Sequence, residues 1–141
     1  MHTILSLLNH PKNLLLVDAM GAFATALTIY FVFASEVLIT GLPVSLLRIM
    51  ALLAMIFACF DLFAFRFSKS AGIPLFIIAA LNLCYCVLTT IVISVNWQTV
   101  TWLGFVYFSV EMIVISSLAA WEFVVGRRAG NTHNWDAGDA T

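Results

Sequence analysis

The chain consists of four long apolar runs separated by short polar breaks. The runs lie near residues 14–34, 43–65, 73–95 and 100–125. Each is about 20 residues or longer, which is the length that a helix needs to cross the hydrocarbon core of a bilayer. Because the runs are continuously apolar and do not alternate with polar residues, a β-barrel is excluded and helices are the remaining way to span a membrane. The pattern predicts an all-α membrane protein with four transmembrane helices.

The breaks between the runs agree with this number of helices. Gly41 and Pro43 interrupt the chain between the first two runs, and Gly72 and Pro74 do so before the third. The third and fourth runs are joined only by the segment NWQT at 96–99. A connection this short predicts a helical hairpin whose two helices are antiparallel neighbours.

Composition places the chain in lipid. It has 141 residues, of which 63% are hydrophobic and 9% charged, and its mean hydropathy is +1.08, values outside the range of soluble domains. We expect one four-helix transmembrane domain over residues 1–128 and a mobile polar tail over residues 129–141. The net charge of −1 and the lack of a basic stripe argue against nucleic acid as a partner.

The basic residues predict the orientation in the membrane. They flank one set of helix ends, whereas the loops after the first and third runs contain none; they are Lys12, Arg66, Lys69, Arg127 and Arg128. Lysine and arginine collect on the cytoplasmic side of membrane proteins. We therefore expect a multi-pass protein of the cell membrane with both termini in the cytoplasm.

Three acidic residues are expected about one helical turn inside the cytoplasmic boundary, given a rise of about 1.5 Å per residue. They are Asp18, Asp61 and Glu122, which we call the inner-side acidic ring. At this depth they are expected to pair with the nearby basic residues or to reach water between the headgroups. The alternative is that they form an entrance for a proton or a cation.

A second polar group is expected deeper in the bilayer. Glu111 and Asn82 fall near the midplane, and Arg48 enters from the outer end of the second helix. A midplane carboxyl group must be paired, protonated or next to a hydrated cavity, so Glu111 either forms an internal ion pair with Arg48 or belongs to a binding or transport site. The candidate binding residues are Arg48, Asn82, Tyr85, Tyr107 and Glu111.

The two glutamates of the last run share one helix face. Glu111 and Glu122 are separated by eleven residues, or about 1100°, which is about 20° from three full turns. Since polar residues in membrane helices normally face the bundle interior, both should point inward, toward the polar face of the third helix.

No pattern of a catalytic, metal or cofactor site is present. The cysteines lie inside the runs without a C-x-x-C spacing, the histidines lie outside them, and no nucleophile elbow or phosphate-binding glycine loop occurs. We therefore predict no catalytic residue, no metal site and no cofactor. An enzyme would need an apparatus built from Glu111, Arg48 and their neighbours, which nothing in the sequence demands.

The local sequences form a recognisable layout. They are LLLVDAMGA in the first helix, an arginine early in the second, AALNLCY in the third, and YFSVEMIVI leading to WEF in the fourth. This layout resembles small four-helix bacterial integral membrane proteins with no assigned activity, and in size and layout it is similar to DoxX-like proteins. The resemblance implies a location in the bacterial inner membrane and no catalytic residues.

Two classes of function remain open. The bundle either binds or moves a small solute or a proton through its inward-facing polar groups, or it is a non-catalytic membrane subunit or scaffold whose buried charges fix helix packing and partners. A homo-oligomer or a second membrane protein is the expected kind of partner besides the lipid bilayer. Hydrated space at Glu111 would favour the first class, and a dry, fully paired Glu111 the second.

Overall fold

The computed structural model describes residues 11–34, 37–68 and 72–138, and all the regular secondary structure in these ranges is helical. The elements are α2 (Pro11–Leu27), the π-helix η1 (Thr28–Phe33), the short α3 (Val37–Thr40), α4 (Val44–Phe67), α5 (Gly72–Val95) and α6 (Trp102–Gly138). Except at the end of the last helix, the helix ends differ from the predicted ones by only a few residues.

Within the described ranges, four helical stretches are long and apolar enough to cross a membrane, as the sequence predicts. They are Asn13–Phe33, Val44–Phe67, Gly72–Val95 and Trp102–Arg128, with mean hydropathies of 1.8, 2.2, 2.4 and 1.8. Their outer surfaces carry many large apolar side chains, among them Phe31, Leu52 and Ile113, each more than 60% exposed. An apolar surface of this extent is stable in lipid and not in water.

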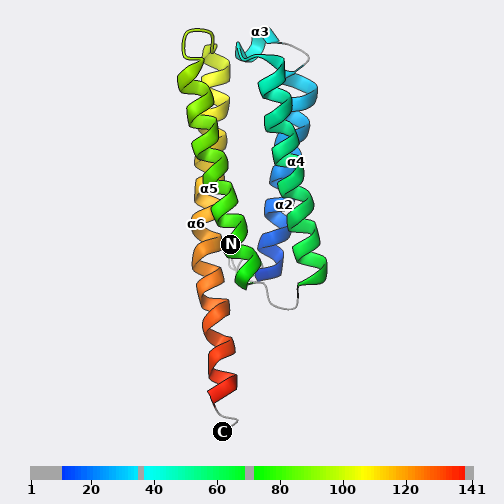
Figure 1. Cartoon of the computed structure of the whole chain (residues 1–141), viewed down its shortest axis with the longest axis vertical. Coiled ribbons are helices and arrows are strands. Elements are labelled where there is room, and N and C mark those ends of the chain that lie inside the picture. Colours follow the sequence, from blue (N-terminus) through cyan, green and yellow to red (C-terminus); the bar gives the residue numbers. More distant parts are fainter. Residues whose placement is uncertain (1–10, 35–36, 69–71, 139–141) are drawn as a thin grey trace, which may run out of the picture.

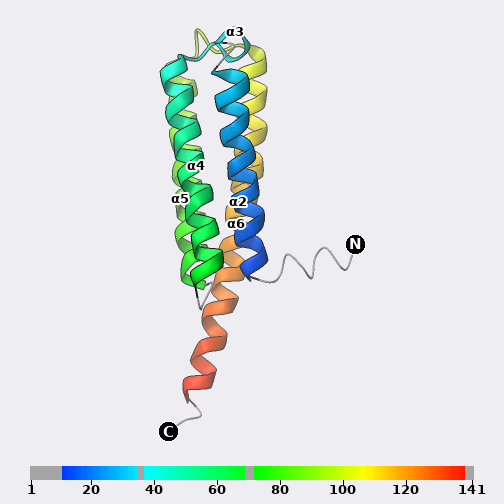
Figure 2. The ribbon, with the colours of Figure 1, turned by 90° about the vertical axis from the view of Figure 1, so that its right-hand side faces the viewer.

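The helices lie lengthwise beside one another in two pairs (Figures 1 and 2). In the first pair, α2 and η1 pack along α4, and in the second pair α5 packs along α6. Contacts between the two pairs are much sparser than contacts within each pair. The loop between α5 and α6 lies beside α3 at one end of the molecule, which we call the α3 end.

Backbone contacts join the two pairs at the α3 end. The Thr101 amide donates a hydrogen bond to the Thr40 carbonyl at 3.0 Å. Gly41 has a φ of 72°, and a Cβ there would lie 1.8 Å from the Thr99 carbonyl oxygen. A Cβ at Gly104 would lie 2.7 Å from the Thr40 carbonyl oxygen. Both glycines are therefore required for the close approach of α3 to the second pair.

Two apolar clusters hold the helices together. The larger one, nearer the α3 end, is built around Ile29, Phe33, Leu47, Met50, Ile93 and Phe108. The smaller one, toward the opposite end, consists of Leu14, Leu15, Ala64, Leu75, Ile78 and Val125. In lipid these contacts stabilise the fold mainly through van der Waals packing, since the hydrocarbon outside is as apolar as the core.

Two features of the helices depart from the sequence prediction. The first transmembrane helix ends in η1, where the Ala34 amide donates to the Ile29 carbonyl at 2.9 Å in place of the usual i−4 partner. Such π-turns occur frequently at functional sites. In addition, α6 continues to Gly138, so the first part of the predicted polar tail is helical, while residues 139–141 lie outside the described ranges.

Candidate binding site

A cavity of about 600 Å³ lies between the two helix pairs. Its walls are mainly apolar and come from both pairs, with Phe33 and Ala54 on one side and Val110 and Ile115 on the other. A few polar side chains also line it: Asp18, Thr25, Asn82, Tyr85, Tyr107 and Glu111. A volume of a few hundred Å³ with apolar walls and a few converging polar groups is typical of small-molecule binding sites.

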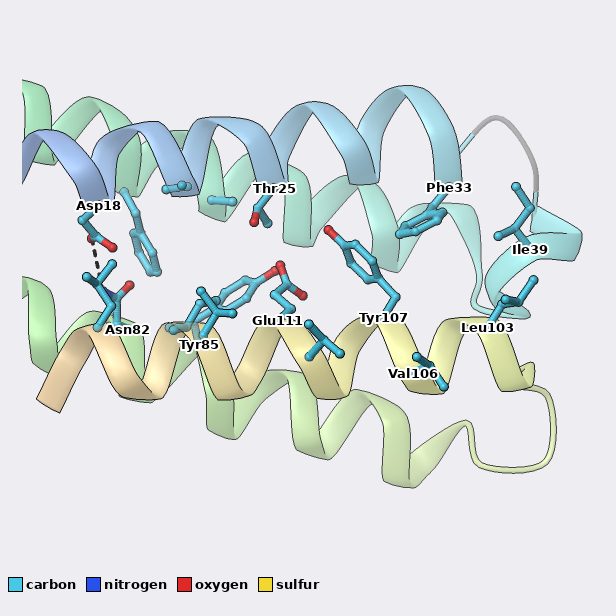
Figure 3. Close-up of a pocket in the computed structure, with 18 residues that line it drawn as sticks. Asp18, Thr25, Phe33, Ile39, Asn82, Tyr85, Leu103, Val106, Tyr107 and Glu111 are labelled. Atoms are coloured by element: carbon cyan, nitrogen blue, oxygen red, sulfur yellow. Dashed lines mark hydrogen bonds between the residues drawn. The ribbon is translucent and has the colours of Figure 1, made fainter. Parts of the chain in front are cut away.

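Glu111 of α6 provides a carboxyl group to this cavity (Figure 3). The residue is only 7% exposed, and neither carboxyl oxygen has a hydrogen-bond partner among the described residues. The hydroxyl groups of Thr25, Tyr85 and Tyr107 are the polar groups that face it. Because a charged carboxylate without a partner is very unfavourable in an apolar environment, Glu111 either holds a proton or binds a group that enters the cavity.

A second group, which we call the acidic cluster, brings together one polar residue from each transmembrane helix. It consists of Asp18, Asp61, Asn82 and Glu122, all of them at most 5% exposed. The Asn82 amide donates to Asp18 at 3.1 Å and to Glu122 at 3.4 Å. Asp61 lies next to Asp18, and its two oxygens have no hydrogen bond within the described part of the chain. Asp18 and Asn82 also line the cavity, so the cluster and the cavity are contiguous.

The acidic cluster corrects the prediction for the inner-side acidic ring. Asp18, Asp61 and Glu122 are buried in the bundle and face one another, and no ion pair joins them to a basic residue whose side chain is described. Depth along a helix does not determine which way a side chain faces, and the Asn82 amide hydrogen-bonds Asp18 and Glu122 inside the bundle.

The expected ion pair between Arg48 and Glu111 is not formed. Arg48 is exposed on α4, while the Glu111 oxygens have no hydrogen-bond partner among the residues that the structure describes. The inward face of α4 carries Leu47, Met50, Ala51, Ala54, Ala58 and Asp61. Arg48 precedes Ala54 by six residues, a rotation of about 600°, so it lies about 120° away from this face. Arg48 therefore does not belong to the candidate binding site.

The other predicted binding residues reach the interior. Tyr85, Tyr107 and Glu111 lie together along the cavity, and Asn82 joins the acidic cluster at the cavity wall. Both glutamates of α6 are buried, and Glu122 accepts its hydrogen bond from α5, in agreement with the spacing argument.

Sequence reasoning overlooked Thr25, whose hydroxyl faces both Glu111 and Tyr107. A signal was present, since Thr25 follows Asp18 by seven residues, or about 700°, and so falls within about 20° of the same face of the first helix. A threonine alone in an apolar helix is not distinctive, and only the neighbouring carboxyl group gives it a role.

The acidic cluster does not resemble a metal site. Over the described part of the chain, no group of three or more histidine, cysteine, aspartate or glutamate residues has an arrangement that could hold a metal ion. The arginines whose side chains are described, Arg48, Arg66, Arg127 and Arg128, are all exposed.

Comparison with known proteins does not assign the site. No family model matches the chain, and neither a curated protein nor a solved structure shows significant similarity to it. The resemblance to small four-helix bacterial proteins and to DoxX-like proteins gains no support from these comparisons. From its own features, the chain is an all-helical protein with four helices suited to crossing a membrane.

Proposed function

We propose that this protein binds, and in doing so moves, a small solute or a proton through the cavity between its two helix pairs, with Glu111 as the binding group. The observation that supports the proposal most directly is the cavity of about 600 Å³ that reaches Glu111. A carboxyl group with a structural role only would be expected to have its partners in place. Within the described part of the chain neither oxygen makes a hydrogen bond of normal geometry, although the hydroxyl groups of Thr25, Tyr85 and Tyr107 lie around the carboxyl group and can hydrogen-bond a bound species together with it.

The acidic cluster extends this site. Asp18 lines the cavity together with Asn82, so a proton that leaves Glu111 can reach one further carboxyl group on the cavity wall. Asp61 and Glu122 lie behind this wall, where Asp61 is next to Asp18 and Glu122 accepts a hydrogen bond from Asn82. Chains of carboxyl groups inside membrane proteins are the usual components of proton relays. The cluster thus supports a role for protons, either as the transported species or as ions exchanged for the solute.

The orientation in the membrane forms part of the proposal. The four long helices are taken as an antiparallel bundle with both termini in the cytoplasm, because Lys12, Arg66, Arg127 and Arg128 belong to helix segments at or beyond the ends opposite α3, and Lys69 follows Arg66 closely in the sequence. The α3 end then faces outward. The proposed compartment is the cell membrane, and specifically the inner membrane if the chain is bacterial.

A membrane subunit or scaffold without transport activity is the alternative. The hydrogen bonds of Asn82 to Asp18 and Glu122 favour it, because they connect three helices and act as a structural staple. In this case the partner is a second copy of the chain or another membrane protein. The two functions differ in what they require of Glu111, which is accessible to a solute only in the first.

The test is chemical modification by dicyclohexylcarbodiimide, an apolar reagent that adds to protonated carboxylic acids, applied to the full chain in proteoliposomes. We expect modification at Glu111, identified by peptide mass spectrometry and lost in Glu111→Gln. Asp61→Asn is the matched control. Glu111 should still be modified in this variant, because Asp61 does not line the cavity. An unmodified Glu111 in a folded protein would overturn the proposal in favour of the scaffold function.

A further inference from the structure

The cavity reaches the outside of the bundle along one side of α6. Four of its lining residues, Leu103, Val106, Val110 and Val114, are 39 to 65% exposed. They are spaced three or four residues apart, so they form one stripe along the helix. Residues that line a cavity and are also exposed mark the edge of its opening.

The opposite edge of this opening is α2, where the side chains are small. Gly21, Ala22 and Thr25 line the cavity there, and Gly21 is itself exposed. A Cβ added at Gly21 would meet nothing within 4 Å. Contacts between α2 and α6 are sparse compared with those inside each helix pair. A gap therefore separates α2 from α6 beside Gly21, and we call it the lateral gap.

The lateral gap opens toward lipid. Gly21 lies in the span Asn13–Phe33, and the stripe on α6 lies in the span Trp102–Arg128. A solute that uses this route must first dissolve in the bilayer, which excludes small hydrophilic molecules and favours a compound with a largely apolar body.

The charge of the cavity determines which apolar compound fits. Among the residues that the structure describes, its ionisable lining residues are Asp18, Glu111 and the two tyrosines, and none of the described lining residues is basic. Aromatic rings lie on both sides of Glu111. Phe33 contacts Tyr107 edge to face at 4.5 Å between ring centroids, and Phe57 lies 6.2 Å from Tyr85. Carboxyl groups and aromatic faces together favour an organic cation.

We infer that the cavity takes up a lipophilic organic cation, such as a quaternary ammonium or phosphonium compound or a protonated amine with an apolar body. The cation enters from the bilayer through the lateral gap and places its charge at Glu111. This inference rests on the proposed function, because it takes Glu111 as the binding group. When a permanent cation binds, Glu111 loses its proton, so the net charge in the cavity does not change. A zwitterionic phospholipid fits less well, because the described lining residues offer no basic group for its phosphate.

The experiment measures binding of radiolabelled tetraphenylphosphonium to the full chain in proteoliposomes, together with proton release into weakly buffered medium. We expect saturable binding accompanied by proton release. Glu111→Gln should weaken binding by about tenfold or more, since the counter-charge is lost. Arg48→Met changes an exposed charge outside the cavity and serves as the control expected to bind normally. Thermal unfolding verifies that each variant is folded.

A second variant tests the entry route. Gly21→Leu places a side chain in the lateral gap and should slow association of tetraphenylphosphonium, whereas Met20→Leu, on the lipid-facing side of the same helix, should not. Equal association rates in Gly21→Leu and in the unmodified protein would overturn the lateral route.

The outcomes separate this inference from the proposed function. If dicyclohexylcarbodiimide modifies Glu111 but tetraphenylphosphonium does not bind, or binds equally well to Glu111→Gln, the inference fails and the proposed function stands. If Glu111 is neither modified nor needed for binding, both fail.

Discussion

Replacing Asn82 by leucine should destabilise the protein, because Asn82 is the only donor seen to hydrogen-bond the acidic cluster within the described residues. Leucine has a similar size, so the substitution removes the amide group without leaving a large cavity. Asp18 and Glu122 then lose bonds of 3.1 and 3.4 Å while remaining buried. The change in stability therefore measures mainly the contribution of these two hydrogen bonds.

The expected magnitude follows from the two bonds. Hydrogen bonds between transmembrane helices contribute about 0.6 kcal/mol on average and about 1.7 kcal/mol at most. The 3.4 Å bond belongs at the low end of this range. Leaving two buried acceptors without a donor adds about 1 kcal/mol or more. We expect a decrease of about 2 kcal/mol in the free energy of unfolding.

The assay is reversible unfolding in mixed detergent micelles, with two comparison variants. Leu83→Ala, on the lipid-facing side of α5, should change the free energy of unfolding by less than about 1 kcal/mol. Asp61→Asn replaces a carboxyl group that faces Asp18 and Glu122 with an amide that donates to them, and it should leave stability unchanged or raise it.

Two results would refute the reasoning. If Asn82→Leu is as stable as the unmodified protein, the two hydrogen bonds do not hold the helices together. If Asp61→Asn is as destabilising as Asn82→Leu, the cluster depends on a charge at Asp61 and hence on a bound cation that neutralises it.

Three further predictions concern other parts of the chain. Gly41→Ala should lower the free energy of unfolding by about 2 kcal/mol or more, because Gly41 has a positive φ and lies close to the Thr99 carbonyl. Gly21→Ala places its methyl group in open space and should not lower the free energy of unfolding. Unfolding in detergent compares the two variants. Arg48→Met should change stability by less than about 1 kcal/mol and should be additive with Glu111→Gln in a double-mutant cycle, since the two residues do not pair. A cysteine at Gln98, in a variant without the native cysteines, should react with an impermeant maleimide from outside intact cells; labelling only after lysis would contradict the cytoplasmic placement of both termini.

Helical periodicity allowed part of this structure to be predicted. The length of the apolar runs identifies the four helices that are long and apolar enough to cross a membrane, and the spacing of Glu111 and Glu122 places both on the inward face of α6. Each of these properties is determined within a single helix and does not depend on its neighbours. Each follows from the rise and rotation per residue, which vary little between proteins.

The site could not be fully predicted because it depends on how neighbouring helices are rotated and shifted. Arg48 was placed in the interior because its depth allowed contact with Glu111, but the rotation of α4 turns it outward. Asn82 was assigned to the level of Glu111, whereas the shift of α5 against α2 brings it to Asp18. The π-turn at Ile29 has no distinctive local sequence from which it could be predicted.

The lateral gap beside Gly21 has a consequence for the resting state of the protein. A space with apolar walls that opens into hydrocarbon fills with acyl chains, which match the polarity of its walls as well as a bound solute does. A solute that binds there must displace lipid chains. Its apparent affinity therefore reflects the difference in binding free energy between the solute and the lipid. Short or unsaturated chains, which enter narrow spaces more easily, should compete more strongly than long saturated ones. The bilayer in which the protein resides would therefore adjust how tightly it binds.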